Sequence, residues 1–132
     1  MTSPRIVFCN CTYAQVLPPE VKEGVLRRLC QSGVAFDAVP DLCELSARRD
    51  SLLKDVASGG PVRIAACFPR AVKWLFASAD APLPLGTTEV LNLRVLSVDE
   101  ATAGLARETL QPNLPAGKVT AADRPVASAA TA

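Results

Sequence analysis

The feature that most constrains the fold of this chain is the alternation of short apolar segments with longer segments of helical periodicity. The short segments are residues 5–9, 34–39, 62–66 and 89–93, and all are rich in aliphatic residues. Such runs are typical of buried strands. In the segments between them, apolar residues recur three or four positions apart, which predicts helices that pack by one face.

Prolines and glycines mark where the predicted helices begin and end. Pro19 suits the first turn of a helix, and Gly33 is typical of a helix end. We expect a second helix over about residues 43–57, a third after Pro69 and a short fourth over residues 99–110. Strands that alternate with helices form parallel βαβ units. We therefore predict a small three-layer α/β domain, Rossmann-like or flavodoxin-like, with a mostly parallel sheet.

The length and the composition of the C-terminal part suggest the domain organisation. A chain of 132 residues is of ordinary size for one domain, and we place the folded domain at residues 1–110. From residue 111 onward Ala, Pro, Thr and Ser dominate. This composition predicts a tail over residues 111–132 that is disordered or serves as a docking extension.

The charge and hydropathy of the chain exclude several classes of protein. The formal net charge is +1 and no stripe of Lys or Arg occurs, so we expect no nucleic-acid binding. The apolar stretches are well short of the roughly 20 residues that span a bilayer, so we expect no membrane span. The N-terminal apolar run is too short for a secretory signal. A cytoplasmic location is the resulting expectation.

The five cysteines and the lack of histidine restrict the chemistry further. Without histidine, mixed Cys/His zinc sites and Ser/His or Cys/His catalysis are excluded. Structural disulfides are rare in a reducing cytosol, so several cysteines in such a chain indicate metal binding or redox chemistry.

Four of the cysteines fall at the ends of predicted strands. Cys9 and Cys11 end the first strand, Cys43 lies in the turn after the second, and Cys67 ends the third. Because the carboxyl ends of parallel strands share one edge of the sheet, we expect these four thiols to converge there. We place Cys30 on the apolar face of the first helix, where a free cysteine acts as a small hydrophobe.

Four thiolates without histidine suit either an iron–sulfur cluster or an all-thiolate zinc site. Structural zinc sites usually use two close cysteine pairs, whereas this chain has one Cys-x-Cys pair and two single cysteines. This spacing favours a cluster, although cysteines that are merely buried are the simplest alternative. Arg70, at the start of the predicted third helix, is a candidate to contact the cluster or a partner, or else an ordinary surface residue.

Several segments also share their order and rough spacing with a known family. They are Cys9-Asn10-Cys11, Leu42-Cys43, Ala65-Ala66-Cys67-Phe68-Pro69-Arg70 with Leu75-Phe76, and Leu91-Asn92-Leu93-Arg94. Over about residues 5–95 the chain resembles the N-terminal iron–sulfur domain found in the flavin-binding polypeptide of heterodisulfide reductase and in related electron-bifurcating proteins. The resemblance implies that the ligands of one [4Fe–4S] cluster are Cys9, Cys11, Cys43 and Cys67.

The chain departs from the pattern of that family at several positions. Thr12 stands where the family usually has Gly, Ala71, Val72 and Lys73 replace a His–Glu pair, and Val95 stands where an acid follows Asn-x-Arg. The four cysteines are retained. The family continues into a flavin-binding domain, but this sequence has no Gly-x-Gly-x-x-Gly, so we expect neither flavin nor NAD in this chain.

Together these observations predict a small electron-transfer subunit within a larger heterodisulfide-reductase-like redox complex. It would be a non-catalytic part of an oxidoreductase, and its partners would be a flavin-containing reductase or hydrogenase-type subunits. Two alternatives remain open. One is a thiol redox protein that uses Cys9 and Cys11, and the other is a zinc-binding scaffold module.

Overall fold

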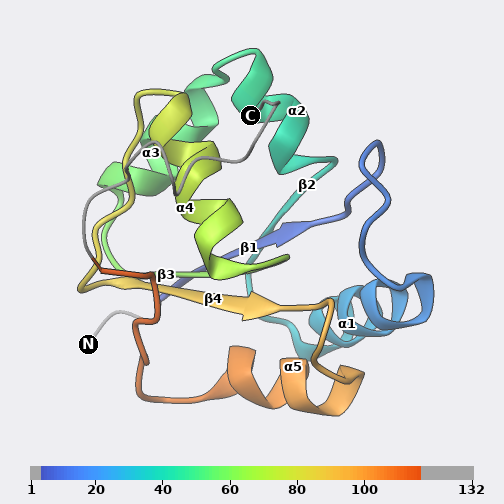
Figure 1. Cartoon of the computed structure of the whole chain (residues 1–132). Coiled ribbons are helices and arrows are strands. Elements are labelled where there is room, and N and C mark those ends of the chain that lie inside the picture. Colours follow the sequence, from blue (N-terminus) through green and yellow to red (C-terminus); the bar gives the residue numbers. More distant parts are fainter. Residues whose placement is uncertain (1–3, 117–132) are drawn as a thin grey trace.

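The sheet consists of four parallel strands in the order β2-β1-β3-β4, and the computed structural model describes residues 4–116 (Figure 1). β1 spans Arg5–Cys9, β2 Asp37–Val39, β3 Val62–Ala66 and β4 Thr88–Asn92. The prediction of an α/β fold with a parallel sheet is confirmed. The order is that of the first four strands of a flavodoxin-like sheet.

The two central strands are the most deeply buried, as expected for a parallel sheet covered on both faces. All five residues of β3 are buried, and only the first residue of β1 is partly exposed. Their bounds agree with the prediction. The prediction of a strand over residues 34–39 was too long, because only 37–39 pair with β1 and Val34 is 50% exposed. β4 begins and ends one residue earlier than predicted.

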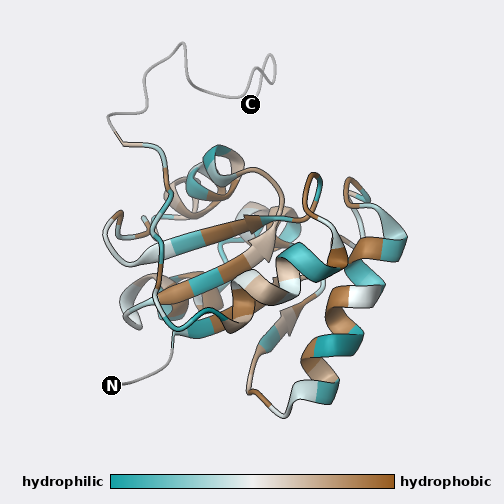
Figure 2. Ribbon diagram, turned by 90° about the horizontal axis from the view of Figure 1, so that it is seen from below, coloured by the Kyte–Doolittle hydropathy of each residue, from teal (hydrophilic) through white to brown (hydrophobic). Residues whose placement is uncertain are grey.

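Helices cover both faces of the sheet, which confirms the three layers (Figure 1). α1 (Pro19–Ser32) and α5 (Val98–Ala106) lie on one face. On the other face lie α2 (Leu42–Ala47), α3 (Ser51–Ser58) and α4 (Pro69–Ser78). Figure 2, seen from the side of α1 and α5, shows hydrophobic residues along the strands that these two helices cover.

Local signals explain where most helices begin and end. Pro19 is the first residue of α1, and Gly33 ends it in the left-handed conformation with φ 76°, which costs glycine little. α5 begins with a capping box in which Ser97 and Glu100 bond each other's backbone N–H groups. α5 ends at Ala106, four residues before the predicted end.

The predicted helix over residues 43–57 is two helices, α2 and α3. Arg49 adopts a left-handed conformation with φ 51°, which interrupts the helical path. Asp50 then caps α3 by accepting a hydrogen bond from the backbone N–H of Leu52 at 2.9 Å. The prediction of a single helix was wrong because the side chain of Asp50 bonds to the backbone as an N-cap, which favours the start of a new helix over continuation of the first.

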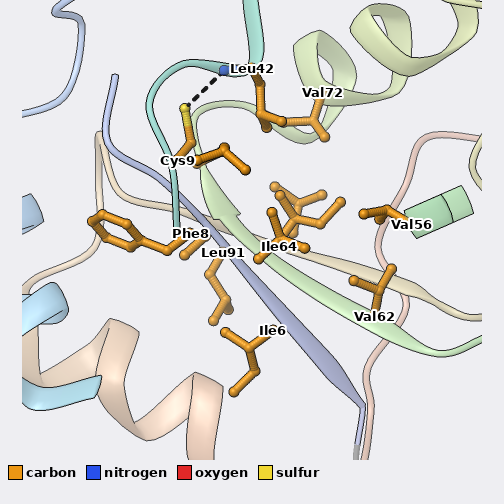
Figure 3. Close-up of a cluster of buried hydrophobic side chains, with 14 of the residues drawn as sticks. Ile6, Phe8, Cys9, Leu42, Val56, Val62, Ile64, Val72 and Leu91 are labelled. Atoms are coloured by element: carbon orange, nitrogen blue, oxygen red, sulfur yellow. Dashed lines mark hydrogen bonds between the residues drawn. The ribbon is translucent and has the colours of Figure 1, made fainter. Parts of the chain in front are cut away.

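The core lies on both faces of the sheet, since successive strand residues point to opposite sides. In β1, Ile6 and Phe8 point toward α1 and α5, whereas Cys9 points toward Leu42 and Val72 on the other face (Figure 3). Phe8 and Val72 are fully buried, and Cys9 is 6% exposed. Cys9 therefore packs in the core between the sheet and the layer formed by α2, α3 and α4.

The segment after α5 returns along the edge strand β4. The side-chain amide of Asn113 donates to the backbone oxygen of Val90 and accepts from its N–H, at 2.8 and 2.7 Å. Lys73 on α4 donates to the backbone oxygen of Pro115 at 2.7 Å. Residues 111–116 of the predicted tail thus cover the edge of β4. Its remainder, residues 117–132, lies outside the described residues.

Candidate cysteine site at the carboxyl edge of the sheet

The cysteines lie where the winding of the sheet changes direction. β1 and β3 are neighbours, but β1 leads to α1 on one face and β3 leads to α4 on the other (Figure 1). Two adjacent loops therefore diverge at the carboxyl ends of the strands, which is the place where open α/β sheets usually bind ligands. Cys9 ends β1 and Cys67 directly follows β3, so both flank this point.

Four cysteines reach this edge with graded exposure. Cys9 and Cys11 are 6% and 4% exposed, Cys67 is half-buried and Cys43 is exposed. Cys43 is the second residue of α2, which begins just after β2. The four thiols thus come from three strand ends, and they extend from the core to the surface.

Electrostatic effects indicate that the four thiols lie near one another, although they are not arranged around one ion. The pKa of Cys43 is raised to about 11, first because burial disfavours the thiolate and next because Asp41, Cys67, Cys9 and Cys11 add negative charge nearby. Cys11 likewise raises the pKa of Cys67. Each of the four is therefore within electrostatic reach of another, although they come from separate segments.

Backbone N–H groups are directed at the buried sulfurs. The N–H of Leu42 donates to Cys9 Sγ at 3.4 Å (Figure 3), and that of Val16 donates to Cys11 Sγ at 3.1 Å. Burial raises the pKa of Cys9 to about 11, while the N–H groups of Leu42 and Cys11 lower it. These donors would stabilise negative charge on sulfur if the thiols became thiolates.

Asp41 connects the two segments that carry three of the cysteines. Its Oδ1 accepts the N–H groups of Cys43 and Glu44 at 2.8 and 3.3 Å, at the start of α2. Its Oδ2 accepts those of Tyr13 and Ala14 at 3.0 and 2.8 Å, in the loop after β1. Burial raises the pKa of Asp41, but the four N–H groups outweigh this effect and lower it.

Backbone bonds fix the same loop more tightly. The N–H of Asn10 donates to the oxygen of Val39, and that of Thr12 to the oxygen of Pro40, both at 2.9 Å. Between them Cys11 has φ 56°, a conformation that non-glycine residues seldom adopt and that often occurs at functional sites. The Cys-x-Cys segment is therefore held rigidly beside the end of β2.

Arg94 supplies a positive charge at this edge. Burial raises the pKa of Cys67, the N–H of Phe68 lowers it, and the charge of Arg94 lowers it further. The Arg94 guanidinium lies 4.8 Å from the centre of the Phe68 ring. The other arginine, Arg70, is the second residue of α4 and is exposed. Its predicted role in cofactor binding stays a prediction.

The prediction for Cys30 was wrong. α1 buries Val25 and Leu29, whereas Cys30 is exposed. Because successive helical residues point about 100° apart, the neighbour of an inward Leu29 points away from the core. Cys30 also lies near the end of α1, at the opposite edge of the sheet from the other four cysteines. It therefore does not belong to this group.

Sequence reasoning did not identify the roles of Asp41 and Arg94. A signal for Asp41 was present, since an aspartate three residues before Glu44 is typical of a helix N-cap. Its contacts with the loop after β1 join residues 27 and 28 positions apart, which no local pattern indicates. Arg94 belongs to the segment that resembles the family, but nothing in the sequence places it beside Phe68.

Two features are absent from residues 4–116. No group of three or more Cys, Asp or Glu side chains there is arranged to hold a metal ion. None of the helices in this part of the chain combines the length and apolarity needed to cross a membrane.

Comparisons of the chain with family models, with curated proteins and with solved structures gave no match.

Proposed function

We propose that this chain is an electron-transfer protein that holds one [4Fe–4S] cluster on Cys9, Cys11, Cys43 and Cys67. One observation carries the proposal: the four cysteines follow the ends of β1, β2 and β3 at one edge of the sheet, and their charges affect one another's pKa. An all-cysteine donor set suits such clusters. The edge at the carboxyl ends of parallel strands is also where this fold class usually binds its ligand.

The surroundings of the thiols fit an anionic group. The N–H groups of Leu42 and Val16 are directed at Cys9 and Cys11, and Arg94 places a positive charge near Cys67. Hydrogen bonds to sulfur, charge and solvent exposure together set the potential of such a cluster. The cluster would supply one-electron chemistry, while these residues would hold it, orient it and partly exclude water from it.

The competing function, a thiol redox protein, fits the site less well. A reactive cysteine needs a lowered pKa, because the thiolate is the nucleophile. Here the pKa values of Cys9 and Cys43 are raised to about 11, and that of Cys67 is also raised. A cysteine ligand of iron must also lose its proton, but the positive charge of the bound iron lowers the pKa of the thiol. The raised values therefore count against free reactive thiols and leave a cluster as the better use of the site.

The test is anaerobic reconstitution with iron and sulfide, followed by metal analysis and EPR of the reduced protein. We expect bound iron and sulfide and an EPR signal in the wild type, and loss of both in Cys67→Ser. Cys30→Ser, at the far edge, is the matched control and should retain them. A colourless protein without iron would refute the proposal. Zinc without a redox signal would indicate a scaffold, and a reversible disulfide in metal-free protein a thiol redox role.

We further propose that the chain works in the cytoplasm with redox proteins, such as a flavin-containing reductase or hydrogenase-type subunits. The cluster would need a donor and an acceptor, and no segment of the sequence carries a Gly-x-Gly-x-x-Gly motif for a nucleotide cofactor. The genes next to the one that encodes this chain are the direct test. Neighbours that encode such subunits would support this assignment, and neighbours unrelated to electron transfer would count against it.

A further inference from the structure

Exposed large apolar side chains gather around the cysteine site. Six such side chains are found among the described residues, and four of them lie on loops at the carboxyl edge: Tyr13, Val16, Phe68 and Val95. Tyr13 and Val95 are 69% and 70% exposed. Apolar groups gathered at one place on a surface often mark an interaction site. We call these four side chains the edge patch.

The edge patch is held in place rather than carried on loose loops. The N–H of Tyr13 is bonded to buried Asp41, and that of Val16 to Cys11 Sγ. Phe68 precedes α4 and packs under Arg94, and the N–H of Val95 donates to the oxygen of Asn92 at 3.2 Å. A surface that is already ordered loses little conformational entropy when a partner binds.

The loops that carry the edge patch are positively charged. Residues 10–18, 67–69 and 92–97 contain one charged residue, Arg94, which is exposed. Of the acids that begin the neighbouring helices, Asp99 pairs with Arg28 at 2.7 Å and Glu44 with Arg48 at 3.2 Å. Glu20 in the first turn of α1 is exposed, and Lys22 beside it donates to the backbone oxygen of Asn10 at 3.0 Å. A partner with carboxylates around an apolar centre would complement this surface.

We propose that the edge patch and Arg94 dock a redox protein whose surface has an apolar centre and an acidic rim. The inference rests on the proposed function. The loops that carry the edge patch also carry Cys11 and Cys67, and Cys43 is exposed at the same edge. A partner seated there would cover the candidate cluster, exclude water from it and bring its own redox centre close. Electrons would then pass in either direction between the two centres.

The docking surface is tested first without any cluster. Isotope-labelled protein is titrated with an oxidised acidic flavodoxin and, as the opposite-charge probe, with basic cytochrome c, and amide NMR shifts are followed. We expect saturable shifts at the edge patch with the flavodoxin only, weakened about tenfold in Arg94→Glu. Arg27→Glu, an equal charge change on exposed α1, is the matched control and should bind normally.

Several results of this titration would overturn the proposal. These are shifts that map to another face, stronger binding of the basic probe, or no binding of the acidic one. Shifts at the edge patch that depend on the concentration of this protein alone would instead identify a second copy as the occupant. Because no iron is involved, failure of the cluster proposal leaves this result unaffected.

The second test measures electron transfer in protein whose iron content and EPR signal have been verified. Reduced flavodoxin and reduced methyl viologen serve as a docking donor and a small donor. We expect Val95→Glu, which places an acid on the edge patch and away from the cysteines, to slow the flavodoxin reaction by about tenfold without slowing the viologen reaction. Equal slowing with both donors would show that the substitution acts on the cluster alone and would overturn the docking role of the edge patch.

Discussion

Two buried carboxylates, Asp41 and Glu89, are held in contrasting ways. Asp41 is 1% exposed and accepts four backbone N–H groups from two loops at the carboxyl edge. Glu89 is 2% exposed, lies early in β4, and accepts Arg63 at 3.0 Å, Arg107 at 2.8 Å and the N–H of Gln111 at 3.1 Å. The pKa of each is lowered despite burial.

The difference shows how one fold uses a buried charge for two purposes. Two guanidinium groups balance the charge of Glu89, and Arg63 also donates to the backbone oxygens of Leu105 and Thr109. This network ties the segment after α5 to the sheet. Asp41 is held by dipoles, so its negative charge persists and raises the pKa of Cys9 and Cys43. One network closes the fold, and the other arranges the candidate site.

The largest expected effect is at the network of Glu89. Glu89→Gln removes the charge that balances Arg63, whose side chain is 3% exposed. Leaving a buried charge without its partner costs about 3–5 kcal/mol in the free energy of unfolding, which urea denaturation would measure. Asp37→Asn, at the more exposed pair with Arg5, is the control and should cost about 0–1 kcal/mol. If Glu89→Gln and Asp37→Asn lost equal stability, burial would not make the Arg63–Glu89 pair more important than the exposed pair.

A smaller loss of stability, but a larger effect on the site, is expected at Asp41. Asp41→Ala removes the acceptor of four N–H groups, which should cost about 2–3 kcal/mol and hasten loss of iron from reconstituted protein in air. Asp50→Ala removes an N-cap of the same type at α3, with one N–H partner. It should cost about 1 kcal/mol and leave iron retention unchanged. If the rate of iron loss in both variants simply rose with the loss of stability, Asp41 would have no specific role at the cysteine site.

The pH dependence of stability sharpens the same comparison. Because the pKa values of Asp41 and Glu89 are lowered on folding, the unfolded state binds more protons in mildly acidic solution. Their contribution is therefore complete above the unfolded pKa of about 4 and is lost as the pH falls through the folded values. Urea midpoints between pH 6 and 3 should fall less steeply in Glu89→Gln than in wild type. Parallel profiles would show that Glu89 contributes nothing to this slope.

The smallest effect is expected at Cys30. Cys30→Ser changes an exposed thiol far from the carboxyl edge, so stability should change by less than about 0.5 kcal/mol. Iron content after reconstitution should equal that of wild type. Calorimetry and metal analysis would measure both quantities. A loss of iron in Cys30→Ser as large as in Cys67→Ser would mean that the ligand set is not the one at the carboxyl edge.

The sequence alone determined the elements whose signals are local. The bounds of β1 and β3, the start of α1 at Pro19 and its end at Gly33 agree with the structure. Apolar runs, prolines and glycines act on the backbone within a few residues, so they can be interpreted without the fold. The alternation of strands and helices also fixed the parallel sheet, and with it the common edge reached by the strand ends.

Only the tertiary structure decided the features that depend on distant segments. The local pattern places Cys30 on an apolar face, but the packing of α1 through Val25 and Leu29 leaves it exposed. The local pattern likewise indicates Asp41 only as a helix cap. In the fold, two backbone N–H groups of the loop after β1 also donate to its Oδ2. Burial and long-range hydrogen bonds depend on how helices rotate and where loops meet. These quantities are set by the packing of the whole chain and by no single segment of it.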